Sequence, residues 1–193
     1  MRHIAQFVRV TVVAGALAGL TASAAFAQDV PKTDVSFGLQ WQRASASDCT
    51  GDECSENLPA GFYADISGGI SPMFSWVGQV DGSSKKDAFD ETDLKFKLYT
   101  FGGGVRVSKA LMRVTPFAQF LAGGMRTKFS EPEFDEPAET AFMIDLGGGV
   151  NIPISSRWGA RVGVDYRKGF FKDEDGGAIN TVRVNFGAIV NLN

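Results

Sequence analysis

The sequence predicts an all-β protein, an eight-stranded antiparallel up-and-down transmembrane β-barrel that follows a cleaved signal peptide. Three observations predict it. Apolar and polar residues alternate in eight segments after residue 34, the connections between these segments alternate between long and short, and the first 27 residues have the composition of an export signal. Alternation with a period of two is typical of strands, because successive side chains point to opposite faces of a sheet.

The amino-terminal segment has the three parts of a secretory signal peptide. Arg2 and Arg9 make its start basic, residues 10–20 form an apolar stretch too short to span a bilayer, and Ala25-Phe26-Ala27 provides a cleavage site of small residues. We expect cleavage after Ala27, with an uncleaved anchor helix as the alternative. No later segment approaches the ~18–20 apolar residues of a membrane helix, so a membrane span after the signal must consist of strands.

The rest of the chain is expected to form one domain. Residues 28–34 are predicted to be a short periplasmic lead-in, and residues 35–193 the outer-membrane barrel domain, a length that suits a single domain. Removal of the signal deletes Arg2 and Arg9 and no acid, so the formal charge of −3 becomes −5. A negative chain without a basic patch is not expected to bind nucleic acid.

In the first four expected strands, one face is apolar and the alternate positions are mostly polar. The apolar residues are Val35, Phe37, Leu39 and Trp41 in the first strand, Phe62, Ala64 and Ile66 in the second, Phe74, Trp76, Gly78 and Val80 in the third, and Tyr99, Phe101, Gly103, Val105 and Val107 in the fourth.

The last four expected strands repeat the pattern, with one exception. In the fifth, the second face mixes Phe117 and Leu121 with Gln119. The apolar residues are Val114, Pro116, Ala118, Phe120 and Ala122 in the fifth strand, Phe142, Ile144, Leu146, Gly148, Val150, Ile152 and Ile154 in the sixth, Trp158, Ala160, Val162, Val164 and Tyr166 in the seventh, and Val182, Val184, Phe186, Ala188, Val190 and Leu192 in the eighth.

The connections indicate how the barrel lies in its membrane. Long polar segments follow the odd-numbered strands, and brief turns follow the second, fourth and sixth. Long extracellular loops and short periplasmic turns are typical of outer-membrane barrels. The long segments are 44–57, 83–93, 130–139 and 168–179, and the turns centre on 69–71, 109–111 and 153–155.

The apolar faces need a cover, which is either lipid or a protein core. In a soluble lipocalin-like barrel they would point inward. Aromatic residues favour lipid, because Trp and Tyr gather at membrane interfaces and several of those on the apolar face lie near strand ends. These residues are Trp41, Trp76, Tyr99, Trp158 and Tyr166.

Several short stretches resemble a known family. They are 57–62 (NLPAGF), 99–104 (YTFGGG), 113–118 (RVTPFA), 146–150 (LGGGV) and 182–187 (VRVNFG). In this order and spacing the chain resembles the small OmpA-type outer-membrane β-barrel proteins over nearly all of residues 35–193. The resemblance implies an outer-membrane location, outer-membrane lipid and lipopolysaccharide as surroundings, insertion by the barrel assembly machinery, and a monomer.

The residues argue against an enzyme or a cofactor site. The only histidine is His3, inside the signal, so His-based catalytic triads are excluded from the mature chain. Glycine triplets at 102–104 and 147–149 match no nucleotide-binding motif. Cys49 and Cys54 are expected to form a disulfide in the first long loop, because export leads to an oxidising compartment. Metal binding by the acids beside them is the alternative to that disulfide.

The third and fourth long loops are rich in acids. Residues 131–139 and 173–175 are interpreted as solvated segments, with divalent-cation bridging to lipopolysaccharide phosphates as the alternative. No EF-hand spacing is present there, and no metal or cofactor is expected.

The polar faces carry four acids and four bases, which are expected to fill the lumen as an ionic network. An eight-stranded barrel is just wide enough for side chains to fill it, and buried charges must pair. We expect Asp145 to lie opposite positions 163–165 and to engage Arg161 or Arg183. The eight residues are Asp65, Asp81, Arg106, Asp145, Arg161, Asp165, Arg167 and Arg183.

The sequence therefore predicts a non-enzymatic outer-membrane barrel with a plugged polar lumen, serving envelope integrity or surface contact through four long loops. The alternative is a small-solute channel or a ligand-binding barrel, porin-like or lipocalin-like.

Overall fold

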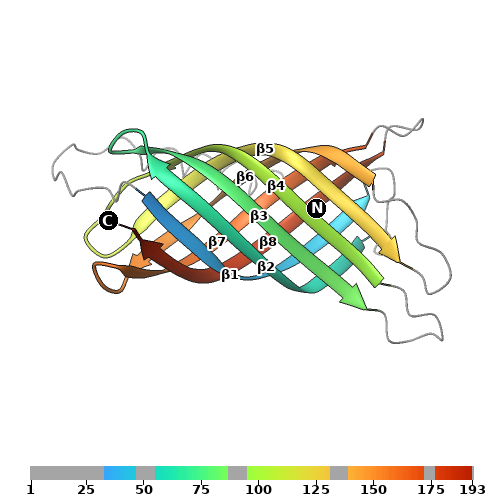
Figure 1. Ribbon diagram of the computed structural model, residues 1–193, viewed down its shortest axis with the longest axis horizontal. Coiled ribbons are helices and arrows are strands. Elements are labelled where there is room, and N and C mark those ends of the chain that lie inside the picture. The colour runs from blue at the N-terminus through green and yellow to red at the C-terminus, as the bar shows by residue number, and fades with distance from the viewer. Residues whose placement is uncertain (1–32, 47–54, 87–94, 131–138, 172–176, 193) are drawn as a thin grey trace, which may run out of the picture.

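The computed structural model describes residues 33–46, 55–86, 95–130, 139–171 and 177–192, and these form a closed barrel of eight antiparallel strands (Figure 1). The predicted fold class is confirmed. The strands are β1 (Thr33–Ala46), β2 (Ser55–Gly69), β3 (Phe74–Lys86), β4 (Lys95–Ser108), β5 (Thr115–Ser130), β6 (Glu139–Pro153), β7 (Trp158–Phe170) and β8 (Ala178–Asn191). The barrel thus begins at Thr33, inside the segment predicted to be a lead-in.

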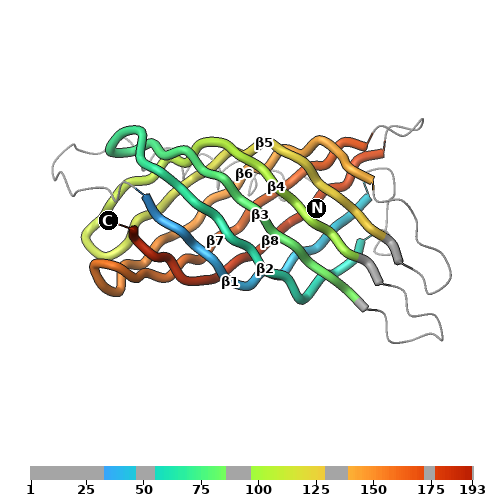
Figure 2. The backbone as a smooth tube through the Cα atoms, in the orientation of Figure 1, coloured from blue at the N-terminus to red at the C-terminus, as the bar shows by residue number. Residues whose placement is uncertain are grey.

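Each strand pairs with the next in the chain, and β1 closes the barrel on β8 (Figure 2). The closing register runs without interruption from Asp34 opposite Asn191 to Ala46 opposite Ile179. Closure matters in lipid, because an open sheet edge would leave unpaired N–H and C=O groups where no water can satisfy them.

The two ends of the barrel differ. At one end, called the turn end, β2–β3, β4–β5 and β6–β7 connect through short turns, on the left in Figure 1. Two of these turns are built alike, since the hydroxyls of Ser71 and Ser155 accept hydrogen bonds from the backbone N–H groups of Phe74 and Trp158 at 3.2 and 3.0 Å.

The opposite end, called the loop end, is where 47–54, 87–94, 131–138 and 172–176 join the strands. The long connections are shorter in the structure than the sequence predicted. The strands continue into the segments assigned to loops, so that β1 runs to Ala46 and β2 begins at Ser55. At the loop end, polar residues still form the backbone hydrogen bonds of the ladder. Because apolar and polar residues no longer alternate there, the sequence gives no sign that the strands continue.

The outer wall carries the apolar face in every strand. Its side chains are exposed, for example Leu39, Phe101 and Leu146 at 58, 54 and 64%, while the alternate positions are buried in the lumen. The mixed fifth strand follows the same rule, with Phe117, Gln119 and Leu121 all inward. Among the described residues, no helix is long and apolar enough to cross a membrane.

Aromatic residues form two belts on this wall. Trp76 and Trp158 lie near the turn end, whereas Trp41, Tyr99 and Tyr166 lie toward the loop end. On β4, eight residue steps separate Tyr99 from Val107, which is roughly 20 Å along the axis for a strand rise of ~3.3 Å and a tilt of ~40°. This is close to the ~25 Å apolar band of outer-membrane barrels.

One bulge interrupts the β1–β2 ladder. Gln40 lies opposite Gly61 and Gln42 opposite Leu58, so Pro59 and Ala60 both face Trp41. Proline cannot donate a ladder hydrogen bond, and a bulge is one of the few positions in a sheet that tolerates it.

Candidate functional site

All eight charged residues predicted for the lumen lie inside the barrel. Their exposed fractions range from 0% for Asp145 to 4% for Asp65. They are held there by the alternation of their strands, because each occupies an inward position and most are flanked on both sides by outward apolar residues. These eight residues are called the lumen network below.

Toward the loop end, the network centres on Asp81 of β3. Arg167 donates two hydrogen bonds to Asp81, at 2.9 and 2.6 Å, and its Nε donates to Asp145 at 2.6 Å. Arg183 lies 3.2 Å from the same Asp81 carboxylate and donates to Asp165 through Nε at 2.9 Å. Asp81 is thus shared by two arginines.

Toward the turn end, the network centres on Asp65 of β2. Arg161 donates to Asp65 at 2.6 Å, and Arg106 lies 3.3 Å from its other carboxylate oxygen. The hydroxyl of Ser36 donates to Asp65 at 2.6 Å. Arg161 also lies 3.6 Å from Asp34, which stands at the edge of the lumen.

Gln119 of β5 joins the two halves. Its amide oxygen accepts from Arg106 at 2.9 and 3.1 Å, and its amide nitrogen donates to Asp165 at 3.0 Å. With Ser36 from β1, side chains from all eight strands therefore take part in one connected set of hydrogen bonds and ion pairs. Such a network restrains the positions of its members, although Oδ1 of Asp145 and Nη2 of Arg161 are buried without a hydrogen-bond partner.

Aromatic rings fill the space between the charges. The ring of Phe117 contacts both Arg106 and Arg161, with its centroid 4.9 and 5.1 Å from the two guanidinium carbons. Glycines provide the room. A β-carbon at Gly149 would come within 2.9 Å of the Phe117 ring, and one at Gly147 would overlap the carboxylate of Asp165. These inward glycines are packing positions, in agreement with the absence of a nucleotide-binding motif.

An apolar cluster lies in the lumen on the loop-end side of the network. Leu58, Leu98, Met125 and Met143 are at most 1% exposed and pack with Phe171 and Ile179. Sequence reasoning missed this cluster. The sequence did contain a sign of it. Leu98 and Met143 each lie two residues before an inward residue, Thr100 and Asp145, so alternation places both in the lumen.

One predicted contact was wrong. Asp145 pairs with Arg167, not with Arg161 or Arg183. The cause is the register of the β6–β7 hairpin, in which Asp145 lies directly opposite Arg167 and Gly147 opposite Asp165. The turn comprises residues 154–157 and Pro153 pairs with Gly159, so the hairpin centre lies about one residue later than predicted.

A double-mutant cycle checks this pairing. We expect Asp145→Ala and Arg167→Ala to couple by about 1–3 kcal/mol in the free energy of unfolding, because the two groups share a buried hydrogen bond. The matched cycle of Asp145→Ala with Arg161→Ala is expected to couple by less than about 0.5 kcal/mol. Stronger coupling to Arg161 would contradict the register.

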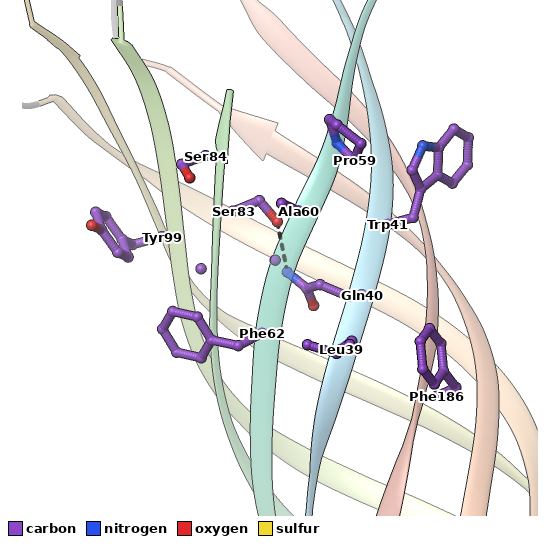
Figure 3. Close-up of a pocket in the computed structure, with 12 residues that line it drawn as sticks. Leu39, Gln40, Trp41, Pro59, Ala60, Phe62, Ser83, Ser84, Tyr99 and Phe186 are labelled. Carbon is purple, nitrogen blue, oxygen red and sulfur yellow. Dashed lines mark hydrogen bonds between the residues drawn. The ribbon is translucent and has the colours of Figure 1, made fainter. Parts of the chain in front are cut away.

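Among the recesses of the described residues, one lies at the turn end and another on the outer wall at the β1–β2 bulge. The first, of about 430 Å³, opens at the turn end, where polar residues such as Ser67, Arg106 and Asn151 line it. The second is a groove of about 510 Å³ on the outer wall over the β1–β2 bulge (Figure 3).

The outer groove is mainly apolar. Phe62 and Tyr99 stand on one side of it and Trp41 and Phe186 on the other, as Figure 3 shows. Gln40, whose amide donates to the hydroxyl of Ser83 at 3.0 Å, lies between them.

Among the described residues, neither recess is lined by a histidine or a cysteine. Among the described residues, no group of three or more His, Cys, Asp or Glu side chains could hold a metal ion. Cys49 and Cys54, the predicted disulfide, lie outside the described residues, as do the acids at 131–138 and 173–175.

A closed antiparallel barrel with an apolar, aromatic-belted outer wall and a charged, packed interior defines an outer-membrane β-barrel protein. The comparisons agree. The chain belongs to the outer membrane protein beta-barrel domain family, whose model matches residues 12–189. Family and fold indicate the Gram-negative outer membrane. No curated protein matches the sequence.

Solved structures show the same fold. Neisserial surface protein A (NspA) aligns with a TM-score of 0.64 at 15% identity, over 83% of this chain and 97% of that one. Ail, the attachment invasion locus protein of Yersinia pestis, aligns with a TM-score of 0.55 at 16% identity, over 81% and 97%. At these identities the likeness concerns the fold alone.

Proposed function

We propose that this protein is a non-enzymatic outer-membrane barrel with a plugged lumen, which contributes to envelope integrity or surface contact through four extracellular segments at its loop end. The observation that carries the proposal is the continuous filling of the lumen. Together with Ser36 and Gln119, the network connects all eight strands through hydrogen bonds and ion pairs. The cluster of Leu58, Leu98, Met125 and Met143 lies beyond it. A solute would have to break buried ion pairs and then cross an apolar layer.

Single-channel recording in planar bilayers tests the plug. The mature protein is expected to give no steady openings, because charged and apolar side chains of the described strands occupy the lumen. A variant with Asp81, Arg167 and Arg183 replaced by serine and Met125 and Met143 replaced by alanine, which removes charges of the network and bulk of the apolar cluster, is expected to conduct once its folding is checked by its unboiled gel mobility. Steady openings of the unmodified protein would instead support a small-solute channel, the candidate that the polar turn-end recess favours.

We also propose that export removes residues 1–27. The mature chain is expected to begin near Gln28, to sediment with the outer membrane, and to migrate differently before and after boiling, since closed barrels resist detergent until heated. Amino-terminal sequencing and gel mobility of the membrane fraction check this. Recovery as a soluble periplasmic protein without detergent would contradict the membrane assignment.

A further inference from the structure

Short side chains line the lumen at the turn end, on the left in Figure 1. Each of the eight strands brings one inward position to the turn-end recess of about 430 Å³. Seven of these positions are polar and the eighth is a glycine, so the lumen, which is filled further inside, stays open at this level. In the order β1 to β8, the residues are Asp34, Ser67, Ser75, Ser108, Thr115, Asn151, Gly159 and Asn191.

A buried cation forms part of the floor of this recess. Arg106 lines the recess although it is only 3% exposed. Its Nε and Nη2 donate to Gln119 at 3.1 and 2.9 Å, whereas its Nη1 reaches the hydroxyl of Ser67 only at 3.5 Å. That distance is at the limit of a hydrogen bond. One donor of this buried guanidinium group is therefore poorly used on the side of the recess.

An unpaired donor and an unpaired acceptor border the same recess. Nη2 of Arg161 and Oδ1 of Asp34 are both buried without a hydrogen-bond partner in the described part of the chain, and they lie 3.6 Å apart. A hydroxyl group has one donor and two acceptor sites, so a single hydroxyl can donate to the carboxylate oxygen and accept from the guanidinium nitrogen. A carbonyl oxygen or an ammonium group would satisfy only one of the two atoms.

The walls of the recess carry neutral hydrogen-bonding groups. Ser75, Ser108 and Thr115 contribute hydroxyls from three consecutive strands, and Asn151 and Asn191 contribute amides. An apolar ligand would take these groups out of water without giving them partners, which is unfavourable. A ligand that both donates and accepts at many points suits these walls.

The charges around the recess are already balanced. Asp65 lies 3.3 Å from Arg106 and 2.6 Å from Arg161, and Asp34 lies 3.6 Å from Arg161. An added anion or cation would therefore find no free counter-charge, and burial of an unpaired charge is costly. The recess thus favours a neutral ligand rich in hydroxyls.

We propose that the turn-end recess binds a neutral saccharide unit of a periplasmic glycan. A sugar ring carries hydroxyls around its edge, so it can meet the polar walls while one hydroxyl bridges Asp34 and Arg161. The volume of about 430 Å³ lies within the range of small-ligand sites. Only the word periplasmic rests on the membrane orientation of the proposed function. The site itself depends neither on that orientation nor on the plug.

The test titrates the full mature protein, in micelles of a zwitterionic detergent without sugar, with N,N′-diacetylchitobiose and with the same disaccharide methylated on every hydroxyl. We expect the methylated form to bind at least about tenfold more weakly, because a site that hydrogen-bonds hydroxyls rejects an analogue whose oxygens cannot donate. Isothermal titration calorimetry gives the two dissociation constants. Backbone amide chemical shifts are expected to change at the turn end and to stay constant at the loop end.

Two matched variants separate the recess from the rest of the barrel. Ser75→Ala/Thr115→Val removes two wall hydroxyls with little change in size, and we expect it to weaken binding of the disaccharide about tenfold. Ser84→Ala/Thr127→Val makes the same two changes at the loop end of β3 and β5 and is expected to leave binding unaltered. Unboiled gel mobility verifies that both variants fold.

Four outcomes would overturn the proposal. Absence of binding would mean that the recess holds water alone, and equal affinity for the methylated disaccharide would mean that its hydroxyls are not recognised. Equal weakening by the two variants, or chemical-shift changes confined to the loop end, would place the binding elsewhere. A conducting barrel that still binds the disaccharide at its turn end would support the site and refute the plug alone.

Discussion

Replacement of Asp81 by alanine is expected to destabilise the barrel by about 3–5 kcal/mol, the largest effect of any single change in the lumen. Asp81 accepts from Arg167 in bidentate fashion and lies 3.2 Å from Arg183. Its loss leaves two arginines, each 1% exposed, without their shared carboxylate. Because Asp145 and Asp165 then compensate the desolvation of these two cations only in part, the cost exceeds the contribution of the ion pairs themselves.

The measurement is the free energy of unfolding by urea in detergent or lipid, compared with that of the unmodified protein. Glu56→Ala is the matched control, since it removes an acid from the exposed pair with Lys85 and should cost no more than about 1 kcal/mol. Similar costs for Asp81→Ala and Glu56→Ala would show that water reaches the lumen charges.

Replacement of Val164 by arginine is expected to cost about 2–4 kcal/mol, because its side chain faces lipid near mid-membrane. Val164 lies in the middle of β7 and is 52% exposed on the outer wall. Gly163 is no control for this change, since a β-carbon there would come within 2.9 Å of Asn185 in the lumen.

Ile154→Arg supplies the control for Val164→Arg. Ile154 is 73% exposed in the β6–β7 turn, where an arginine reaches water and should cost about 0–1 kcal/mol. Both variants are compared by urea unfolding in lipid vesicles. Equal costs at the two positions would mean that the wall does not face lipid, as in the soluble barrel considered from the sequence.

The alternation of side chains was enough to predict the strands and their faces, including a difficult case. In β5 the inward set is Phe117, Gln119 and Leu121, which looks too apolar for a lumen. The Phe117 ring suits its inward position because it makes cation–π contacts with Arg106 of β4 and Arg161 of β7, which belong to other strands. The local sequence determines whether a side chain points inward or outward. The type of residue at an inward position depends on side chains from other strands that it meets in the lumen.

Pairings were harder to predict than faces. The Asp145 partner was wrong because a shift of one residue in the hairpin centre moves the opposite residue by two, from Asp165 to Arg167, and both have inward parity. Hydrophobic alternation cannot detect such a shift, since every side chain keeps its face. The contact of Arg161 with Asp65 could not be predicted either, because β7 and β2 are not consecutive strands in the sequence.

The ion pairs that cross the lumen also select the number of strands. Arg161 on β7 meets Asp65 on β2, and Arg167 on β7 meets Asp81 on β3, although these strands share no backbone ladder. A closure with six or ten antiparallel strands would change the width of the barrel and move these groups apart, which would leave buried charges without partners. The interior charges thus disfavour misassembled barrels. Backbone hydrogen bonds cannot do so, because they are the same in every antiparallel pair of strands.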